Sequence, residues 1–228
     1  MSVVRIDGEP MPVEVELAET ALIVIDMQKD FLCRGGFGEF LGNEPDLLQR
    51  TVAPISRLLA AARPLGMTII HTREGHLPDL SDCPAAKLER WPAGTRIGDI
   101  RPMGRILIRG EEGHAIVEEV APLAGELVID KPGKNAFYAT ELDGYLRQRA
   151  IRNLLVVGVT TDVCCMATTI AANDHGYNAI VLSDCVASYS PERHRATLAT
   201  IKAQGGIFGW VTTSDAVLAG IAERELSS

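Results

Sequence analysis

Residues 153–159 read NLLVVGV, and this apolar run leads into the stretch TTDVCC (160–165). The run is rich in Val and Leu, and polar residues do not alternate with apolar ones. Strands with this pattern are covered on both faces, which is typical of parallel sheets. Runs of the same kind recur at 21–27, 67–72, 126–131, 178–184 and 206–213. The sequence therefore predicts a mostly parallel, six-stranded sheet.

Segments with apolar residues at helical spacing lie between many of these runs. They cover 44–66, 139–150, 162–177, 190–206 and 214–226. The segment 190–206 has the clearest ends, with Ser190 as a cap, Pro191 at the first position and Gly205 after the last turn. Alternating strands and helices predict a three-layer α/β domain, in which helices flank both faces of the sheet.

The region from 74 to 120 interrupts this alternation. It contains GHLPDLSDCPAAKLERWPAGTRIGD and RILIRGEEGH, which are rich in Pro, Gly and charged residues. We expect a long surface excursion there, and excursions of this length are usually functional or disordered. The sequence shows no internal repeat and no clear domain boundary, so 1–228 is predicted to form a single domain with its core at about 18–222.

The composition argues against several classes of function. The formal net charge is −8, from 22 basic and 30 acidic residues, and no cluster of Lys and Arg indicates contact with nucleic acid. No apolar stretch approaches the roughly 20 residues that cross a bilayer, and the N-terminus has no secretion-signal pattern. We therefore expect a cytoplasmic protein without nucleic-acid or membrane partners. The five cysteines are odd in number and scattered, which argues against a disulfide framework, and the absence of a CxxC pair argues against a structural zinc site.

Three reactive side chains follow three of the apolar runs. Asp26, Lys131 and Cys164 each lie at or just beyond the carboxyl end of a different run. In open parallel sheets, ligands bind at these ends of the strands. Cys164 begins a predicted helix, and a helix N-terminus beside a lysine lowers the pKa of a thiol. Asp26 could accept the thiol proton, and backbone N–H groups could hold an oxyanion, so the combination predicts catalysis by a cysteine nucleophile.

The pattern alone leaves other roles open. An Asp after a strand is often a turn former, a Lys there is usually solvated, and a Cys among small residues usually belongs to the core. Cys164 and Cys165 could form a redox pair, although a bond between adjacent cysteines is strained. A ligand-binding protein that has lost catalysis is a third alternative.

Long segments of the chain resemble the isochorismatase-like cysteine hydrolases. The resemblance covers roughly 18–222 and includes ALIVIDMQKDF, VIDKPGKNAFYATELDGYLRQRAIRNLLVVGVTTDVC and GYNAIVLSDC. It implies a Rossmann-like sheet and a catalytic triad, with Cys164 as nucleophile, Asp26 as base and Lys131 as third member. It also implies a non-proline cis peptide bond that enters Thr160, and an oxyanion hole formed by the backbone N–H groups of Thr160 and Cys164.

The same resemblance bears on metals and cofactors, and none is expected. Nicotinamidases of this family bind a metal through an Asp-x-His pattern and further histidines, whereas here no histidine follows Asp26 before His71. His71, His76 and His114 are therefore expected to be structural or pocket-lining residues, because a metal site needs several matched ligands.

A closer resemblance is to the subgroup of biuret and triuret amidohydrolases. It rests on IIHTREGHLPDLSDCPAAK, GRILIRGEEGH, IDKPGKNAF and AQGGIFG. It implies substrate contacts from Phe31, Lys134 and Gln204. The expected reaction is hydrolysis of biuret to allophanate and ammonia through a covalent acyl-enzyme. Triuret, ureidoacrylate and N-carbamoyl amino acids are the alternative substrates. The resemblance further implies a homo-oligomer, either a dimer or a tetramer.

Overall fold

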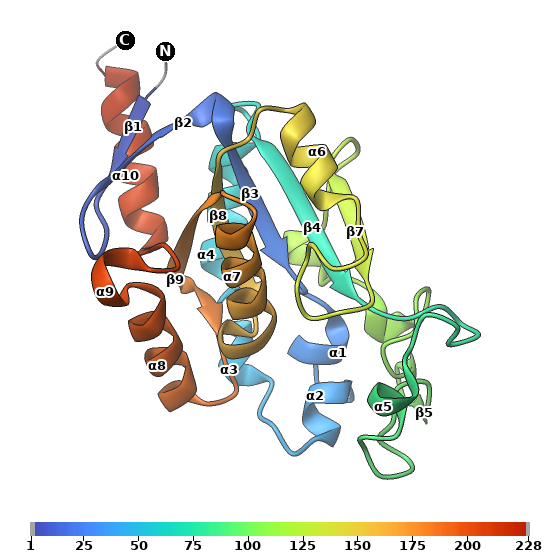
Figure 1. The fold of residues 1–228 in the computed structure, drawn as a ribbon. Coiled ribbons are helices and arrows are strands. Elements are labelled where there is room, and N and C mark those ends of the chain that lie inside the picture. The colour runs from blue at the N-terminus through green and yellow to red at the C-terminus, as the bar shows by residue number, and fades with distance from the viewer. Residues whose placement is uncertain (1–2, 227–228) are drawn as a thin grey trace.

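A six-stranded sheet forms the centre of the computed structural model, which describes residues 3–226. The strand order is β10-β9-β8-β3-β4-β7, and every neighbouring pair is parallel (Figure 1). The strands are β3 (Thr20–Ile25), β4 (Thr68–Glu74), β7 (Leu127–Lys131), β8 (Asn153–Val159), β9 (Asn178–Ala187) and β10 (Trp210–Thr212). The predicted parallel sheet is confirmed.

The order of the strands places a crevice at the middle of the sheet. From β3 the chain builds outward through β4 to β7, and it then returns to the other side of β3 with β8. Loops that leave β3 and β8 therefore diverge to opposite faces, and parallel sheets bind ligands at such a reversal point. Asp26 and Cys164 both lie in the segments that leave these two strands.

Helices cover both faces of the sheet, so the predicted three-layer architecture is confirmed (Figure 1). Alternate residues of the strands enter two separate cores because successive side chains point to opposite faces. On one face Leu22 and Leu155 pack with α4 (Val52–Ala62) and α10 (Ser214–Leu226). The opposite core includes buried residues of α6 (Leu142–Gln148), α7 (Met166–Asp174) and α8 (Pro191–Ile201).

Several helix boundaries differ from those predicted. The segment 44–66 forms two helices, α3 (Asp46–Gln49) and α4, and the proline at position 54 lies in the first turn of α4, where its missing N–H costs little. Ser190 caps α8 as predicted, since its hydroxyl accepts from the backbone N–H of Arg193 at 3.2 Å. The rest of the segment 190–206 forms a separate turn, α9 (Ala203–Gly206).

The N-terminal residues form an antiparallel hairpin that the sequence reading did not include. Its strands are β1 (Val3–Ile6) and β2 (Val13–Glu16), and a 3-10 turn, η1 (Leu17–Glu19), leads into β3. Val4 and Ile6 are buried in the core that contains α10, while their neighbours face outward. This alternation of buried and exposed residues is the usual signal of a half-covered strand.

The excursion between β4 and β7 is ordered and carries its own small core. It contains α5 (Ala85–Leu88), β5 (Ile100–Arg101), β6 (Gly104–Arg105), η2 (Glu112–His114) and η3 (Glu118–Val120). Its buried residues, among them Cys83 and Ile106, pack against Phe37 of α2 (Phe37–Phe40). The buried Asp30 of α1 (Lys29–Leu32) joins the two regions, because its carboxylate accepts from the backbone N–H groups of Phe37 and Leu107 at 3.2 Å each.

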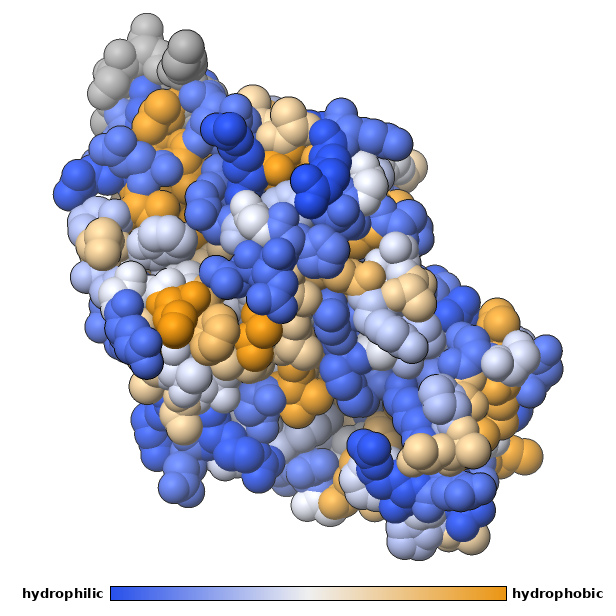
Figure 2. Space-filling view, in the orientation of Figure 1, coloured by the Kyte–Doolittle hydropathy of each residue, from blue (hydrophilic) through white to orange (hydrophobic). Residues whose placement is uncertain are grey.

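The surface visible in Figure 2 is mostly hydrophilic, and the cysteines form no disulfide bonds. Hydrophilic residues dominate the face that Figure 2 shows, and apolar residues form small patches on it. All five cysteines are free thiols. Among residues 3–226, no helix combines the length and the apolar character that a bilayer crossing requires.

Candidate active site

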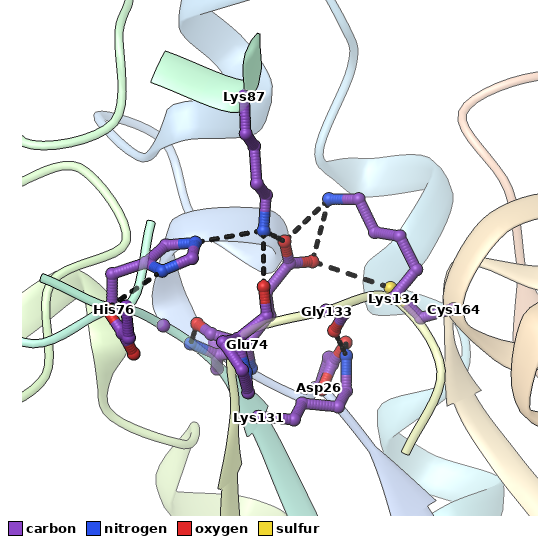
Figure 3. Close-up of polar contacts among 12 residues, drawn as sticks. Asp26, Glu74, His76, Lys87, Lys131, Gly133, Lys134 and Cys164 are labelled. Carbon is purple, nitrogen blue, oxygen red and sulfur yellow. Dashed lines mark hydrogen bonds and ion pairs between the residues drawn. The ribbon is translucent and has the colours of Figure 1, made fainter. Parts of the chain in front are cut away.

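Four polar side chains meet at the carboxyl end of the sheet (Figure 3). Asp26 follows β3, Glu74 ends β4, Lys131 ends β7, and Cys164 lies in η4 (Thr161–Cys165), a π-helical turn directly after β8. All four are buried. The predicted convergence of Asp26, Lys131 and Cys164 is therefore present in the structure, together with a second carboxylate.

Asp26 and Lys131 form an ion pair beneath the cavity. The Lys131 Nζ lies 2.7 Å from Asp26 Oδ2, and both side chains are fully buried. The Thr72 hydroxyl donates to Asp26 Oδ1 at 2.7 Å, and Lys131 Nζ also donates to the carbonyl of Gly133 at 3.0 Å. Burial would lower the pKa of Lys131, but the negative charge of Asp26 and its other anionic neighbours outweighs burial and raises it. Lys131 is therefore a permanent cation beside the reactive groups.

Cys164 faces both carboxylates. Its thiol donates to Glu74 Oε2 at 3.6 Å, and one atom from each of Asp26, Glu74 and Cys164 lies within 4.8 Å of the other two. Burial raises the pKa of the Cys164 thiol well above its usual value, and Lys131 only partly opposes this. The expectation of a lowered pKa is therefore wrong, because desolvation outweighs the nearby cation. A protonated thiol needs a base before it can attack, and Asp26 is within reach for that role.

The turn before Cys164 has the geometry that the family resemblance implied. The peptide bond between Val159 and Thr160 is cis, as predicted. The carbonyl of Thr160 accepts from the N–H groups of Val163 and Cys165, at 3.1 Å each, which closes the turn around the nucleophile. Thr160 and Cys164 both line the cavity, where their N–H groups remain the predicted oxyanion hole. Cys165 is fully buried in the core and does not line that cavity.

Glu74 is a residue of the site that sequence reasoning missed. Its carboxylate is fully buried and is bound by Lys134 Nζ, at 2.6 and 2.8 Å from its two oxygens, and by Lys87 Nζ at 3.1 Å. Burial would raise the pKa of Glu74, but the ammonium groups of Lys134, Lys131 and Lys87 lower it to about 2. The apolar run ends at Thr72, whereas β4 continues to Glu74. An acidic residue two positions beyond Thr72 lies on the same face of the strand, and that spacing was the available signal.

A cavity of about 290 Å³ opens above Cys164. Its polar floor is made by Cys164, Glu74 and Lys134, and Thr160 and Ser188 add further polar atoms. The walls are mostly apolar and come from Phe31, Leu41, Trp91, Val159, Val163 and Tyr189. The predicted pocket residues Phe31 and Lys134 are thus in place beside the nucleophile.

Gln204 does not reach this cavity, so the predicted contact between Gln204 and the substrate is wrong within this chain. It is exposed in α9, with a φ of 51°, and it is absent from the cavity lining. The reason is topological, because α9 leads into the parallel strand β10 and therefore lies at the amino ends of the strands. The nucleophile lies at the opposite edge of the sheet, at the carboxyl end of β8.

The donor atoms of the site do not have the arrangement of a metal centre. Asp26, Glu74 and Cys164 are close enough to share an ion, but Lys131 and Lys134 already neutralise the two carboxylates at 2.8 Å or less. The histidines at 71, 76 and 114 do not converge, since each faces a different carboxylate, at 126, 82 and 130 respectively. The described residues thus present no second set of metal ligands at the cavity.

Comparisons with known proteins agree with this geometry. The family model described as "Isochorismatase domain" matches residues 20–216. The chain is 32% identical to the ureidoacrylate amidohydrolase RutB of Stutzerimonas stutzeri, over 93% of this chain and 87% of that protein. It is 30% identical to the ureidoacrylate amidohydrolase RutB of Methylorubrum extorquens, over 97% of this chain and 90% of that protein.

Solved structures show the same fold. A cysteine hydrolase from Pseudomonas syringae pv. phaseolicola aligns with a TM-score of 0.78 and 29% identity, over 92% of this chain and 95% of that one. An isochorismatase family protein from Desulfovibrio vulgaris aligns with a TM-score of 0.72 and 28% identity, over 90% and 98%. The sheet, the buried Cys–Asp–Lys group and these likenesses together show that the chain belongs to the isochorismatase family, among its cysteine hydrolases.

Proposed function

We propose that this protein is a cysteine amidohydrolase that releases ammonia from a small ureido compound, R–NH–CO–NH2. The observation that carries the proposal is the position of the Cys164 thiol, which lies between the Asp26–Lys131 ion pair and a cavity with a polar floor. Nucleophile, base and cation are thereby within reach of one reacting carbonyl group. The relatives named as ureidoacrylate amidohydrolases support amide chemistry on a ureide.

The reaction follows from the roles that these groups can take. Asp26 accepts the thiol proton, and the Cys164 thiolate attacks the ureido carbon. The oxygen becomes negative and is held by the N–H groups of Thr160 and Cys164. The proton on Asp26 passes to the terminal amino group, which leaves as ammonia and gives a carbamoyl thioester, R–NH–CO–S–Cys164. Asp26 then takes a proton from water, and the resulting hydroxide attacks the thioester carbon. The C–S bond breaks, Asp26 returns its proton to the sulfur of Cys164, and the acid R–NH–COOH leaves and loses its own proton to solvent.

Lys131 makes this proton transfer feasible without taking part in bond making. Its buried ammonium group lies 2.7 Å from Asp26 and stabilises negative charge on Asp26 or on the sulfur of Cys164. Asp26 and Cys164 exchange one proton in the field of this ammonium group.

The substrate that we propose is of the ureidoacrylate type rather than biuret. The relatives above are ureidoacrylate amidohydrolases, which favours this substrate over the biuret expected from the closer sequence resemblance. The cavity agrees, since Phe31, Leu41 and Trp91 give it apolar walls beside the polar floor. Biuret has no apolar part, whereas the C=C unit of a ureidoacrylate can contact these walls and its carboxylate can face Arg193, which also lines the cavity.

An ammonia-release screen tests the proposal. Purified protein is offered ureidoacrylate, biuret, triuret, N-carbamoyl amino acids and nicotinamide, with the Cys164→Ala variant as control. We expect the highest kcat/KM on ureidoacrylate and no ammonia from the variant. Turnover of biuret above ureidoacrylate would overturn the choice of substrate. A Cys164→Ala variant with full activity, or a wild-type protein without activity on any ureide, would overturn the function.

A further inference from the structure

The carboxylate of Glu74 is fixed in the active site through both its backbone and its side chain. Gln28 fixes its backbone from both sides, since Gln28 Oε1 accepts from the Glu74 N–H at 2.7 Å and Gln28 Nε2 donates to the Glu74 carbonyl at 2.9 Å. The side chain then points toward the cavity, where Oε2 accepts from the Cys164 thiol (Figure 3). A second carboxylate beside the sulfur opposes formation of the thiolate, and the ammonium groups of Lys134 and Lys87 offset its charge.

We propose that Glu74 contacts the substrate by accepting hydrogen bonds from its ureido N–H groups, and that Lys87 of the excursion positions Glu74 for this contact. The inference rests on the proposed function, because it names the residue of the same site that recognises the ureido group.

The distances place the ureido nitrogens within reach of Glu74. A sulfur poised for attack lies about 3–3.5 Å from the carbonyl carbon, and each nitrogen is about 1.3 Å from that carbon. The carbonyl oxygen is directed to the N–H groups of Thr160 and Cys164, so the N–H groups of the ureide point away from that side. Glu74 Oε2, at 3.6 Å from the sulfur, is then an acceptor for them.

Deprotonation of the Cys164 thiol frees Glu74 Oε2 to accept a hydrogen bond from the substrate. An ionised carboxylate offers about four lone-pair directions. Lys134 contacts both oxygens, Lys87 contacts Oε1, and the thiol of Cys164 contacts Oε2. When Cys164 loses its proton, Oε2 loses a donor and faces a thiolate. A ureido N–H that takes the vacated direction restores the hydrogen bond and screens the two negative charges from each other.

Lys87 is the contact that ties this carboxylate to the excursion. It comes from α5, and its Nζ donates to Glu74 Oε1 at 3.1 Å, to the carbonyl of Pro132 at 2.7 Å and to His76 Nε2 at 2.9 Å. An ammonium group has three donors, and all are used here. The remaining ring nitrogen of His76 faces Asp82 Oδ1 at 3.1 Å, which assigns the ring proton to Nδ1 and leaves Nε2 as an acceptor. Lys87 is therefore a positioning residue that acts through Glu74.

Two measurements on Glu74→Gln separate a substrate contact from an effect on the thiol. The first is kcat/KM for the ureide, which we expect to fall about 10- to 100-fold, as for a lost hydrogen bond to a charged group. The second is the rate at which methyl methanethiosulfonate, a small reagent without N–H groups, modifies Cys164, with mass spectrometry to locate the label. Removing a negative charge beside the sulfur favours the thiolate, so labelling should be equally fast or faster. The matched control is Glu89→Gln, the same change at an exposed residue just after α5, which should alter neither rate.

Lys87→Met tests the positioning role and does not depend on the folding of the Glu74 variant. Loss of one cation raises the pKa of Glu74 from about 2, so the acid limb of kcat/KM should move to higher pH than in the wild type. Lys87→Arg keeps the charge and should restore much of the wild-type profile.

The outcomes distinguish this inference from the function on which it rests. Wild-type protein without ureide turnover refutes the proposed function, and the inference fails with it. If the wild type is active and Glu74→Gln keeps full kcat/KM, or loses labelling and turnover in parallel, only the inference is overturned. If Lys87→Met leaves the acid limb of the kcat/KM profile at the wild-type pH, the positioning role of Lys87 is overturned.

Discussion

The ion pair between Lys131 and Asp26 offers a quantitative test of the site. At 2.7 Å and an effective dielectric constant of about 20, two unit charges attract by about 6 kcal/mol. Desolvation offsets much of this attraction, because both side chains are fully buried. Lys131→Met removes the attraction and leaves Asp26 with its desolvation penalty and the single hydroxyl donor of Thr72. We expect the variant to lose about 3–5 kcal/mol of its free energy of unfolding.

A double-mutant cycle isolates the pair. The free energy of unfolding is measured by urea denaturation at pH 7 for the wild type, Lys131→Met, Asp26→Asn and the double variant. The double variant removes both charges, so its loss should be smaller than the sum of the single losses by about 2 kcal/mol. Additive single losses would refute the reasoning.

Four further outcomes are expected. Cys165→Ala should keep most of the ammonia release that Cys164→Ala abolishes, and the reverse result in the same assay would move the nucleophile by one position. Dialysis against a chelator should leave kcat unchanged, whereas a loss of activity that a divalent metal restores would contradict a metal-free site. The Glu74 carboxyl has a pKa of about 2 in the folded protein against an ordinary 4.5. It therefore contributes about 3 kcal/mol of stability above pH 4.5, and this contribution is lost as the pH falls toward 2. The free energy of unfolding, measured by urea denaturation, should therefore differ less between pH 7 and pH 3 in Glu74→Gln than in the wild type. An equal difference in the two proteins would contradict this. Gly158→Ala should lower the free energy of unfolding by about 2–4 kcal/mol. The reason is that Gly158 has a φ of +112° and that an added Cβ would lie 2.0 Å from the carbonyl oxygen of Ile25. An unfolding curve equal to that of the wild type would contradict this.

The sequence was sufficient to predict the sheet and the catalytic group because both depend on local signals. An apolar run without alternation indicates a strand covered on both faces, and polar residues that end such runs must meet at one edge of a parallel sheet. Asp26, Lys131 and Cys164 were identified in this way, and they are close together in the structure.

The sequence was insufficient where the outcome depends on three-dimensional surroundings. The raised pKa of Cys164 reflects how deeply the turn is buried, which no local pattern reports. Gln204 was assigned by resemblance alone, although its place before a parallel strand puts it at the other end of the sheet. The contact between Lys87 and Glu74 joins residues 13 positions apart through a folded excursion, and charged residues in such a segment look like solvated ones in the sequence.

The proposed catalytic residues and some of the residues around the cavity come from different parts of the chain. Asp26, Lys131 and Cys164 are attached to the strands, whereas Trp91 and Lys87 belong to one continuous insertion between two adjacent strands, β4 and β7. The ends of that insertion are fixed by neighbouring strands, and its buried residues form a small core together with Phe37 of α2. Exchanging this insertion between homologous enzymes should change the substrate preference and leave Asp26, Lys131 and Cys164 unchanged, provided that the exchanged segment retains a lysine that contacts Glu74.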